Sequence, residues 1–542
     1  MLSSRQFEQN FPIFVKWSLW LVILFGVILR ITNVTSNFMF FYDEGFYLNF
    51  NYPLLEIIDK HPPQDLGSFM QALYAVLRLS LGTGKALWFF IVDSRALWGG
   101  LDFFVFPKIV STLAGLLTLP VVYLFTKRMT NSQATALLSA AILAVLPSHV
   151  LYSRLAMQES LSTLFFMLTL YFYVFPKELT WRTFLSSVLA AGVYFTNYRL
   201  IIVPLLIAFT EVIPGLLDKR LPNGRKLMWH TLIFFLLVFT IGSIDKGQNI
   251  TTTFSWMFRQ ADLGKSQLDP INFLSYPYYL FRLESLVFGF LFFGNLYFLY
   301  KRDWHKAMPF LLVCFLMLIF SFAADKAARY LCVGLPLAAM GIALLLAESY
   351  HEKKKLSVHF GAELLMACLL LSLLPKAMAI NRSRCAYRVV VDAIKMINPK
   401  AKILSTQPWI QNLYVKDRGD VQELPHNFES LLKRYQQGFQ YIVLDPQAFI
   451  SYTASKEKFT FRLEDYLAFL TQHVKPVKAS GHFDEVVLER FVFEHSENLR
   501  TSLDFLNSRN KQLGAIYIYD LKDSIGKMLA LAAQQTKKPS NE

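Results

Sequence analysis

The chain has 542 residues, of which 54% are hydrophobic and 17% are charged. Soluble globular proteins carry about 25% charged residues, so this composition excludes an ordinary soluble enzyme and a disordered protein. The net charge is +15, but the basic residues lie mostly in short connections between apolar segments, so membrane topology explains them better than nucleic-acid binding. The four cysteines have no CxxC or Cys/His metal spacing, which argues against a structural zinc site.

Eleven segments are apolar over about the 20 residues that a membrane-spanning helix needs. We read the first as a retained anchor and not as a signal peptide, because Arg30 and Asn33 follow it without a small-residue cleavage site. The sequence therefore predicts a mainly α-helical fold, a polytopic transmembrane bundle. The spans are expected at 13–33, 104–126, 133–152, 160–176, 181–197, 199–217, 228–244, 280–300, 307–323, 328–348 and 358–379.

The basic residues give these spans an orientation. With the N-terminus in the cytoplasm, every predicted inner connection carries at least two Lys or Arg residues, which is the positive-inside pattern. The segments 34–103 and 245–279 then lie outside, and so does the C-terminal region 381–542. We therefore expect a multi-pass protein of the plasma (inner) membrane whose C-terminal region is extracytoplasmic.

The chain is expected to form two domains, a transmembrane domain at 1–380 and a soluble α/β domain at 381–542. In the second domain, short apolar runs typical of strands alternate with amphipathic helical stretches. In the first outer segment, the amphipathic stretch Gln71–Leu81 is expected to lie along the membrane surface. The expected strands are Lys402–Ser405, Tyr441–Leu444, Val486–Leu488 and Ile516–Tyr519, and the expected helices are Phe428–Tyr435 and Tyr466–Gln472.

The first outer segment holds two features that could carry chemistry. Asp43 and Glu44 are adjacent acids just after the first span. Either both are solvated surface acids, or one of them is a general base that deprotonates an acceptor hydroxyl at the membrane face. His61 precedes two prolines that stiffen the turn, so it belongs either to a plain loop or to a rigidly presented metal ligand or hydrogen-bond donor.

Further ionisable residues lie at the outer ends of later spans. Arg154 and Glu159 flank an apolar stretch. They form either an interfacial salt bridge or a functional pair. Lys326 and Arg329 are three residues apart and would share a helix face, where two cations suit lipid headgroups or a bound phosphate. Arg199 lies on the same outer side. Together these residues fit a phosphate-bearing substrate at the membrane surface and a hydroxyl acceptor from outside.

These motifs resemble the GT-C superfamily of integral-membrane glycosyltransferases. The resemblance is closest to the branch of protein O-mannosyltransferases, lipid A aminoarabinose transferases and rhizobial lipopolysaccharide sugar transferases, and it covers roughly residues 13–350. The residues that carry it are Asp43-Glu44, His61-Pro62-Pro63, Leu146-Pro147-Ser148-His149, Tyr152 to Ala156 with Glu159, and Arg329-Tyr330-Leu331 with Pro336.

The resemblance implies that a sugar is transferred with inversion from a polyprenyl-phosphate donor to a hydroxyl of a lipid, glycan or protein acceptor on the outer face. Asp43 would be the base, and Glu44 and Glu159 would orient the acceptor or a divalent metal ion, with His61 and Glu44 as its ligands. No nucleotide cofactor is expected, because the lipid carrier lies between spans. The residues expected to bind the donor phosphate are Lys326, Arg329, Arg154, Arg199 and Tyr330.

Two other functions would use the same lipid-linked substrates. A transporter or flippase usually shows internal repeats and polar sites at the membrane midplane, and the sequence has no clear repeat. A polymerase or ligase shares the donor chemistry, so the sequence separates it poorly from a transferase. The acidic pair directly after the first span favours the transferase.

Overall fold

The computed structural model divides into two compact units, residues Met1–Thr35 with Asn51–Arg382 and residues Ser36–Phe50 with Ser383–Glu542. The residues described are 13–34, 42–50, 52–97, 105–175, 178–217, 222–265, 270–323, 326–351, 356–383, 387–406, 408–412, 415, 418–425, 427–444, 469–470, 472–482, 485–494, 498–508 and 515–536.

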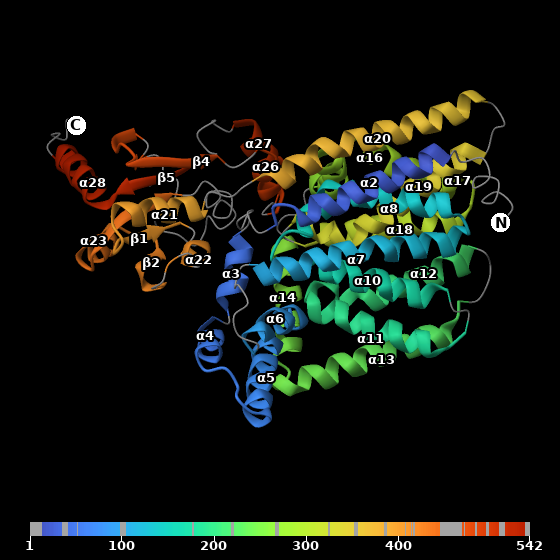
Figure 1. The fold of residues 1–542 in the computed structure, drawn as a ribbon, viewed down its shortest axis with the longest axis horizontal. Helices are drawn as coiled ribbons and strands as arrows, with labels where there is room; N and C mark the ends of the chain where they lie inside the picture. The colour runs from blue at the N-terminus through green and yellow to red at the C-terminus, as the bar shows by residue number, and fades with distance from the viewer. Residues whose placement is uncertain are drawn as a thin grey trace. The chain divides into compact units, whose positions relative to one another are not determined.

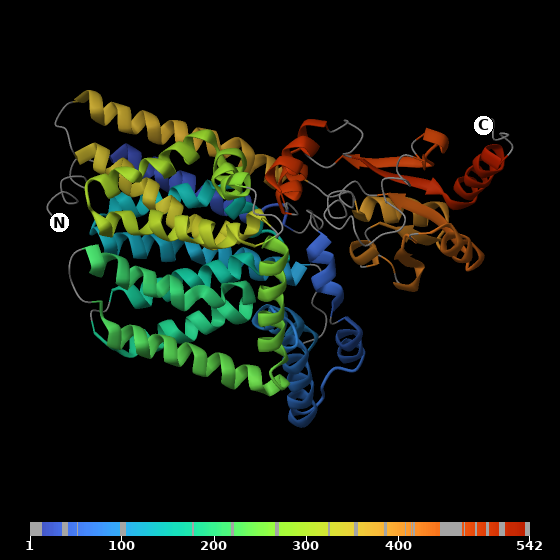
Figure 2. The same ribbon diagram turned by 180° about the vertical axis from the view of Figure 1, so that it is seen from behind.

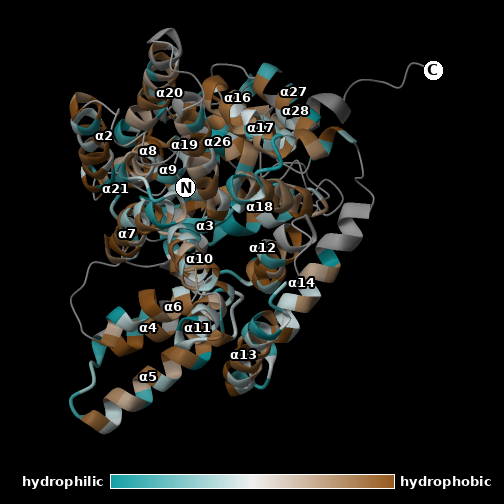
Figure 3. Cartoon of the chain, turned by 90° about the vertical axis from the view of Figure 1, so that its right-hand side faces the viewer, coloured by the Kyte–Doolittle hydropathy of each residue, from teal (hydrophilic) through white to brown (hydrophobic). Residues whose placement is uncertain are grey.

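The first unit is a bundle of long apolar helices that run side by side (Figures 1 and 2). Among the described residues, six helices are long and apolar enough to cross a membrane. Large apolar side chains stay exposed on the outside of the bundle, as on α2, where Phe14 is 80% exposed, and Figure 3 shows how apolar the helices are. Such surfaces suit a lipid surrounding, so this is a multi-pass membrane protein. The helices are α2 (Ile13–Ile31), α7 (Val105–Thr130), α8 (Gln133–Val145), α10 (Glu159–Val174), α11 (Trp181–Thr196), α12 (Val203–Leu217), α13 (Gly224–Gly242), α16 (Leu286–Gly294), α17 (Leu296–Tyr300), α18 (Trp304–Ser321), α19 (Leu335–His351) and α20 (Leu356–Arg382).

Helix lies at each of the eleven expected spans, but the number of membrane crossings stays a prediction. The span expected at 133–152 is not one continuous helix. It breaks at Leu146 and resumes as α9 (Pro147–Tyr152), because Pro147 has no N–H to continue the α8 hydrogen bonds.

Three other expected spans are also interrupted. The π-helical turn η5 (Leu280–Glu284) precedes α16 and α17 in one of them. The 3₁₀ turn η2 (Tyr198–Ile202) precedes α12, and the 3₁₀ turn η6 (Ala328–Gly334) precedes α19. In a membrane such breaks are tolerated where neighbouring groups satisfy the freed backbone, and two of these turns carry residues of the site below.

At one end of the bundle, α5 (Leu66–Leu81) and α14 (Gln248–Lys265) run across the long helices (Figures 1 and 2). Helix α5 contains the expected amphipathic stretch and begins earlier, where the Asp65 carboxylate accepts a hydrogen bond from the Ser68 N–H at 2.7 Å. Helix α14 lies within 245–279, a segment that the sequence analysis placed outside the membrane without assigning it secondary structure. The smaller elements of this unit are α4 (Tyr52–Lys60), α6 (Ala86–Asp93), η1 (Ser94–Leu97), η3 (Ser243–Asp245), η4 (Pro270–Leu274) and α15 (Ser275–Tyr279).

The second unit contains a mixed five-stranded sheet in the order β2-β1-β3-β5-β4. Strand β1 pairs in parallel with β2 and β3, and β5 is antiparallel to β3 and β4. The strands are β1 (Lys402–Ser405), β2 (Val421–Glu423), β3 (Phe439–Leu444), β4 (Lys478–His482) and β5 (Ala515–Asp520). The helices are α3 (Tyr42–Phe50), α21 (Tyr387–Ile397), α22 (Pro408–Gln411), η8 (Arg418–Asp420), α23 (Phe428–Gln436), α26 (Glu485–Glu494), α27 (Leu499–Ser508) and α28 (Leu521–Thr536).

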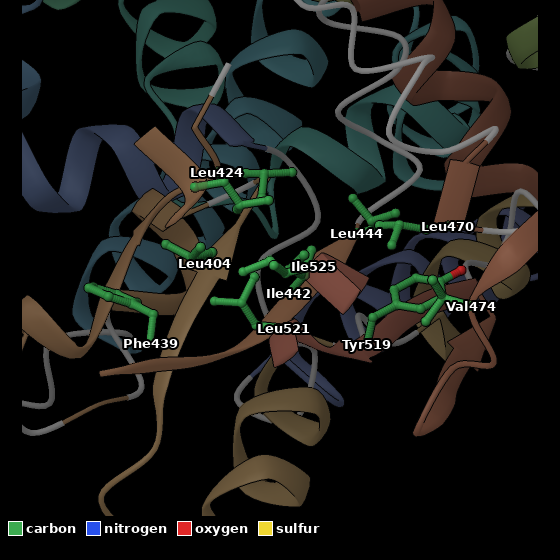
Figure 4. Packing of buried hydrophobic residues seen from close by; sticks show 11 residues of the cluster. Leu404, Leu424, Phe439, Ile442, Leu444, Leu470, Val474, Tyr519, Leu521 and Ile525 are labelled. Carbon is green, nitrogen blue, oxygen red and sulfur yellow. The ribbon is translucent and has the colours of Figure 1, made fainter. Parts of the chain in front are cut away.

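The core of this unit lies between the sheet and its helices. Leu404, Ile442 and Tyr519 project from neighbouring strands and lie in one cluster with Ile525 of α28 (Figure 4). Leu431 of α23 belongs to the same cluster. Apolar residues at alternate positions of the strands therefore hold the sheet against the helices.

Three of the four strands expected in this region are present, as β1, β3 and β5, and the helix expected at Phe428–Tyr435 is α23. The fourth expected strand, Val486–Leu488, is wrong, because these residues lie in the helix α26. A short apolar run fits a buried helix as well as a strand, and here the run continues with helical spacing. The helix expected at Tyr466–Gln472 falls partly outside the described residues.

Candidate active site

The connection between α9 and α10 carries the most buried group of ionisable residues from the sequence analysis. Arg154 and Glu159 are each 1% exposed. Helix α7 holds this connection from one side: the Ser111 hydroxyl donates to the Met157 carbonyl at 2.9 Å, and the Thr112 hydroxyl donates to the Ser153 carbonyl at 2.9 Å. The connection is therefore fixed along its length.

Glu159 opens α10 and lies among cations. Its Oε1 accepts a hydrogen bond from the Gln158 amide at 2.9 Å, whereas Oε2 has no hydrogen-bond partner among the described residues. The carboxylate interacts electrostatically with three basic residues, namely Arg329, Lys85 and Arg199. A charged carboxylate buried alone would be costly, and these cations offset part of that cost.

The three cations come from separate breaks in the helical bundle. Arg329 lies in η6, which packs on the first turns of α10; there the Thr163 hydroxyl contacts the Cys332 sulfur at 3.4 Å. Arg199 lies in η2, with its guanidinium carbon 4.5 Å from the centre of the Tyr330 ring, a cation–π distance. Tyr330 thus orients Arg199 from the side of η6.

Lys85 was not found by the sequence analysis. It precedes α6 in a tight turn after α5, where the Tyr198 N–H donates to the Gly84 carbonyl at 3.0 Å. A Cβ on Gly84 would lie 2.3 Å from the Tyr198 ring, so only glycine allows this approach. The glycines at 82 and 84 were the signal of a tight turn, but only the fold shows that the turn lies against η2.

Arg154 has a second, structural contact. Its Nη1 donates to the carbonyls of Leu29 and Thr32, the latter at 2.7 Å, and so caps the end of α2. Its Nε and Nη2 are buried without a hydrogen-bond partner among the described residues. Burial lowers the pKa of Arg154 to about 10, so the guanidinium stays charged at neutral pH with two donors left for an anion.

Unpartnered polar atoms gather in this short stretch of chain. Besides the atoms of Arg154 and Glu159, the Gln158 amide oxygen and the Ser160 hydroxyl are buried without a partner among the described residues. Buried polar groups are normally hydrogen-bonded. Four such residues within positions 154–160, beside three cations, are therefore typical of a site that binds a polar ligand.

Lys326 differs from the sequence expectation. It precedes η6 in an extended segment, and its ammonium group donates to the Ala323 carbonyl. Because residues 328–334 form a 3₁₀ turn and α19 begins only at Leu335, the expected α-helical face shared by Lys326 and Arg329 is not present. Lys326 is buried, and its role at a phosphate stays a prediction.

The acidic pair lies in the first turn of α3, within the second unit. Glu44 is buried, while Asp43 is only partly buried. Glu44, Tyr47 and Leu48 form one buried helix face, and α3 packs on α22. A negative side chain is favourable at this position because the helix dipole is positive at its N-terminal end.

The assignment of His61 and Glu44 as metal ligands stays a prediction. His61 is exposed in the bend after α4. Across the described residues, no three side chains of His, Cys, Asp or Glu lie together in a way that could hold a metal ion. The set of His61 and Glu44 is therefore not supported by a third ligand.

Residues 96–243 match the family of dolichyl-phosphate-mannose-protein mannosyltransferases. This match includes α7 to α13, and with them Arg154, Glu159 and Arg199. No curated protein matches the sequence.

Solved structures resemble the whole chain. The apo oligosaccharyltransferase of Archaeoglobus fulgidus has 10% identity and a TM-score of 0.54, covering 95% of this chain and 89% of that one. Apo ArnT of Cupriavidus metallidurans has 11% identity and a TM-score of 0.52, covering 94% of this chain and 99% of that one. The chain has the GT-C fold.

Other GT-C structures of these proteins contain ligands. ArnT has been solved bound to undecaprenyl phosphate, with 12% identity, a TM-score of 0.51, and 92% of this chain and 97% of that one covered. The Archaeoglobus fulgidus AglB has been solved with an inhibitory peptide and a dolichol-phosphate, and an oligosaccharyltransferase of the same organism with Zn and sulfate.

Proposed function

We propose that this protein is a membrane glycosyltransferase that moves a sugar from a polyprenyl-phosphate carrier to a hydroxyl group of a lipid, glycan or protein on the outer face. The observation that carries the proposal is the buried Glu159 carboxylate, surrounded by Arg329, Lys85 and Arg199, at the interrupted helices of a GT-C fold. The family match and the two GT-C neighbours support the same reaction class.

The cations suit the donor phosphate. When the bond between the sugar and the phosphate breaks, negative charge grows on the phosphate oxygens, and positioned cations stabilise that charge by a few kcal/mol, or about 10²–10³ in rate. Arg329 and Arg199 supply planar guanidinium groups that can bind phosphate through two hydrogen bonds. The unpartnered donors of Arg154 fit the same anion. Lys326 and Tyr330 stay in the proposed set on the strength of the sequence motif.

The acids suit the acceptor. Asp43 is proposed as the base because it is the more exposed of the two acids in α3. It takes the proton of the acceptor hydroxyl while the acceptor oxygen attacks the anomeric carbon from the face opposite the phosphate, so the configuration is inverted. The carbon–oxygen bond to the phosphate breaks, and the polyprenyl phosphate leaves. Glu44 and Glu159 are proposed to orient the acceptor, with no step routed through a metal ion.

The reaction is proposed for the extracytoplasmic face of the plasma (inner) membrane. The support is the distribution of basic residues, which puts the N-terminus in the cytoplasm and the C-terminal domain outside. The acceptor arrives from that side and the lipid tail stays among the helices, so both substrates meet at the membrane surface.

The test is transfer by the purified full-length protein in proteoliposomes loaded with polyprenyl-phosphate-linked sugars. Acceptors are identified by mass spectrometry of surface glycans and glycoproteins from cells with and without the protein. Asp43→Asn is expected to abolish transfer while the protein still binds undecaprenyl phosphate. The control is Asp65→Asn, which changes another exposed acid but keeps a good N-cap for α5, and it should keep full activity.

The same vesicles separate the alternatives. Movement of the lipid-linked sugar across the bilayer without transfer would identify a flippase, and growth of a repeated glycan chain would identify a polymerase. Full transfer by Asp43→Asn would remove Asp43 from the role of base.

A further inference from the structure

Arg30, at the end of α2, is fully buried and holds the break between α8 and α9. Its Nη1 donates to the Ala144 carbonyl at 2.5 Å, and its Nη2 donates to the Leu143 carbonyl at 3.1 Å and contacts the His149 Nδ1 at 2.7 Å. Neither the sequence motifs nor the charge cluster around Glu159 includes this residue. These three partners lie within one turn of the break, and Nη1 also donates to the Gly26 carbonyl of its own helix at 2.7 Å.

The two carbonyls that Arg30 binds are those that the break deprives of helical partners. In a continuous helix, the Leu143 carbonyl would accept from residue 147, but Pro147 has no N–H. The Ala144 carbonyl would accept from residue 148, but the Ser148 N–H donates instead to the Glu284 carboxylate at 3.1 Å. The Leu143 carbonyl keeps a shorter-range bond from the Leu146 N–H at 3.3 Å, so Arg30 is its second donor. At Ala144, Arg30 replaces the missing helical bond, and an orphaned carbonyl there would be costly inside an apolar bundle.

Gly26 makes this contact possible. A Cβ at this position would lie 2.4 Å from the Ala144 carbonyl oxygen and 2.7 Å from the Ala144 Cβ. Since these atoms belong to the backbone and to a side chain without flexibility, α2 can approach α8 this closely only with glycine. One turn later, Arg30 is then near enough to reach the carbonyls.

A second contact joins the chain after α9 to the end of α2. Arg154 donates to the carbonyls of Leu29 and Thr32 at the end of α2, and the Asn381 amide donates to the same two carbonyls at 2.7 and 3.2 Å. We call the two arginines with their carbonyl partners the arginine clasp. This clasp fixes α2 against both ends of α9. The connection that leads to Glu159 continues from Arg154.

We propose that Arg30 is a positioning residue for the donor-phosphate site, which acts by fixing α9 and thereby the connection that holds Arg154 and Glu159. This inference rests on the proposed function. A guanidinium can satisfy two carbonyls and an imidazole at once because its donors lie in a rigid fork, whereas a lysine ammonium presents a single point of charge. Without the fork, α9 can shift, and a shift of about 1 Å at a reacting group costs up to about a hundredfold in rate.

The test uses full-length protein in detergent and measures the Kd for undecaprenyl phosphate together with kcat and KM for transfer. Arg30→Lys is expected to raise the Kd and lower kcat/KM by about ten- to a hundredfold, with the protein still folded. Gly26→Ala should have the same effect without removing any hydrogen-bonding group. The matched control is Arg128→Lys, because Arg128 lies over the rings of Phe175 and Tyr171 in another part of the bundle.

A double-mutant cycle separates positioning from simple stabilisation. If Arg30 acts through the connection, the fold-change caused by Arg30→Lys should differ when Glu159→Gln is also present, whereas Arg128→Lys should give the same fold-change in both backgrounds. An unchanged Kd in folded Arg30→Lys, or loss of the folded protein in both Arg30→Lys and Gly26→Ala, would overturn the proposal. Failure of the wild-type protein to bind undecaprenyl phosphate would instead count against the proposed function.

Discussion

Asn249 holds the turn that carries Lys85, so its replacement should weaken both the fold and the site. Its side chain is 1% exposed. The amide nitrogen donates to the Leu81 and Thr83 carbonyls at 3.1 and 2.7 Å, and the amide oxygen accepts from the Tyr194 hydroxyl at 2.8 Å. Asn249→Leu keeps the approximate size of the side chain and removes all three bonds.

The expected loss of stability follows from the polar groups that lose their hydrogen-bond partners. Each lost hydrogen bond contributes about 1 kcal/mol, and each buried carbonyl left unsatisfied costs about 1–3 kcal/mol. Two unsatisfied carbonyls and one lost bond from the Tyr194 hydroxyl should lower the free energy of unfolding by about 3–7 kcal/mol, a large part of the 5–15 kcal/mol that folded proteins typically have. The freed turn should also displace Lys85 and weaken binding of undecaprenyl phosphate by about tenfold or more.

The assay combines thermal unfolding in detergent with the Kd for undecaprenyl phosphate. Asn249 also begins an Asn-Ile-Thr glycosylation sequon, so a lost glycan could be mistaken for a lost hydrogen bond. Thr251→Ala removes the same sequon at an exposed position and should change neither measurement. Wild-type stability in Asn249→Leu, or an equal loss in Thr251→Ala, would refute this reasoning.

Two other predictions concern close packing and pH. Gly84→Ala should destabilise the protein by about 1–3 kcal/mol and weaken phosphate binding, because its Cβ would lie 2.3 Å from the Tyr198 ring; thermal unfolding should show no such loss in Gly82→Ala, whose Cβ would first meet an atom at 3.4 Å. Burial raises the pKa of Tyr519 to about 12, while an unfolded tyrosine has a pKa of about 10. The Tyr519 hydroxyl therefore stays protonated to a higher pH in the folded state than in the unfolded state. The stability that depends on this protonated hydroxyl is complete below pH 10 and falls by about 2–3 kcal/mol as the pH rises to about 12. Pulse proteolysis of the full-length protein between pH 9 and 12 should show this fall, and an equally steep fall in Tyr519→Phe would contradict it.

The positions of the helices were predictable because their signal is local. A run of about 20 apolar residues indicates a helix in lipid wherever the rest of the chain lies, and helices were found at every expected span. The interruptions of the helices were harder to predict from the sequence. Pro147 was present in the sequence, but the expected span still ran through it to residue 152, since proline is tolerated in membrane helices when a neighbour satisfies the freed carbonyls. That neighbour is Arg30, which is 117 residues away along the chain.

The α/β region shows the same limit at shorter range. Lys402–Ser405 was correctly read as a strand, but Val486–Leu488 was not, because three apolar residues fit both periodicities and the choice depends on what they pack against. Likewise, the sequence indicated that Glu159 and Arg329 carry chemistry, since ionisable residues near spans are costly. It gave no comparable sign for Lys85, whose importance comes only from the approach of its turn to η2.

The amino-acid sequence alone determined that the chain is a membrane protein, roughly where its helices lie, and which charged motifs lie near their ends, because hydropathy and charge act within a few turns of helix. The tertiary structure decided which cations surround Glu159, that Arg154 also caps α2, and that Arg30 completes the broken helix. These contacts join residues that lie from about 40 to about 170 positions apart in the chain, and their energies depend on burial and distance, which no local pattern encodes.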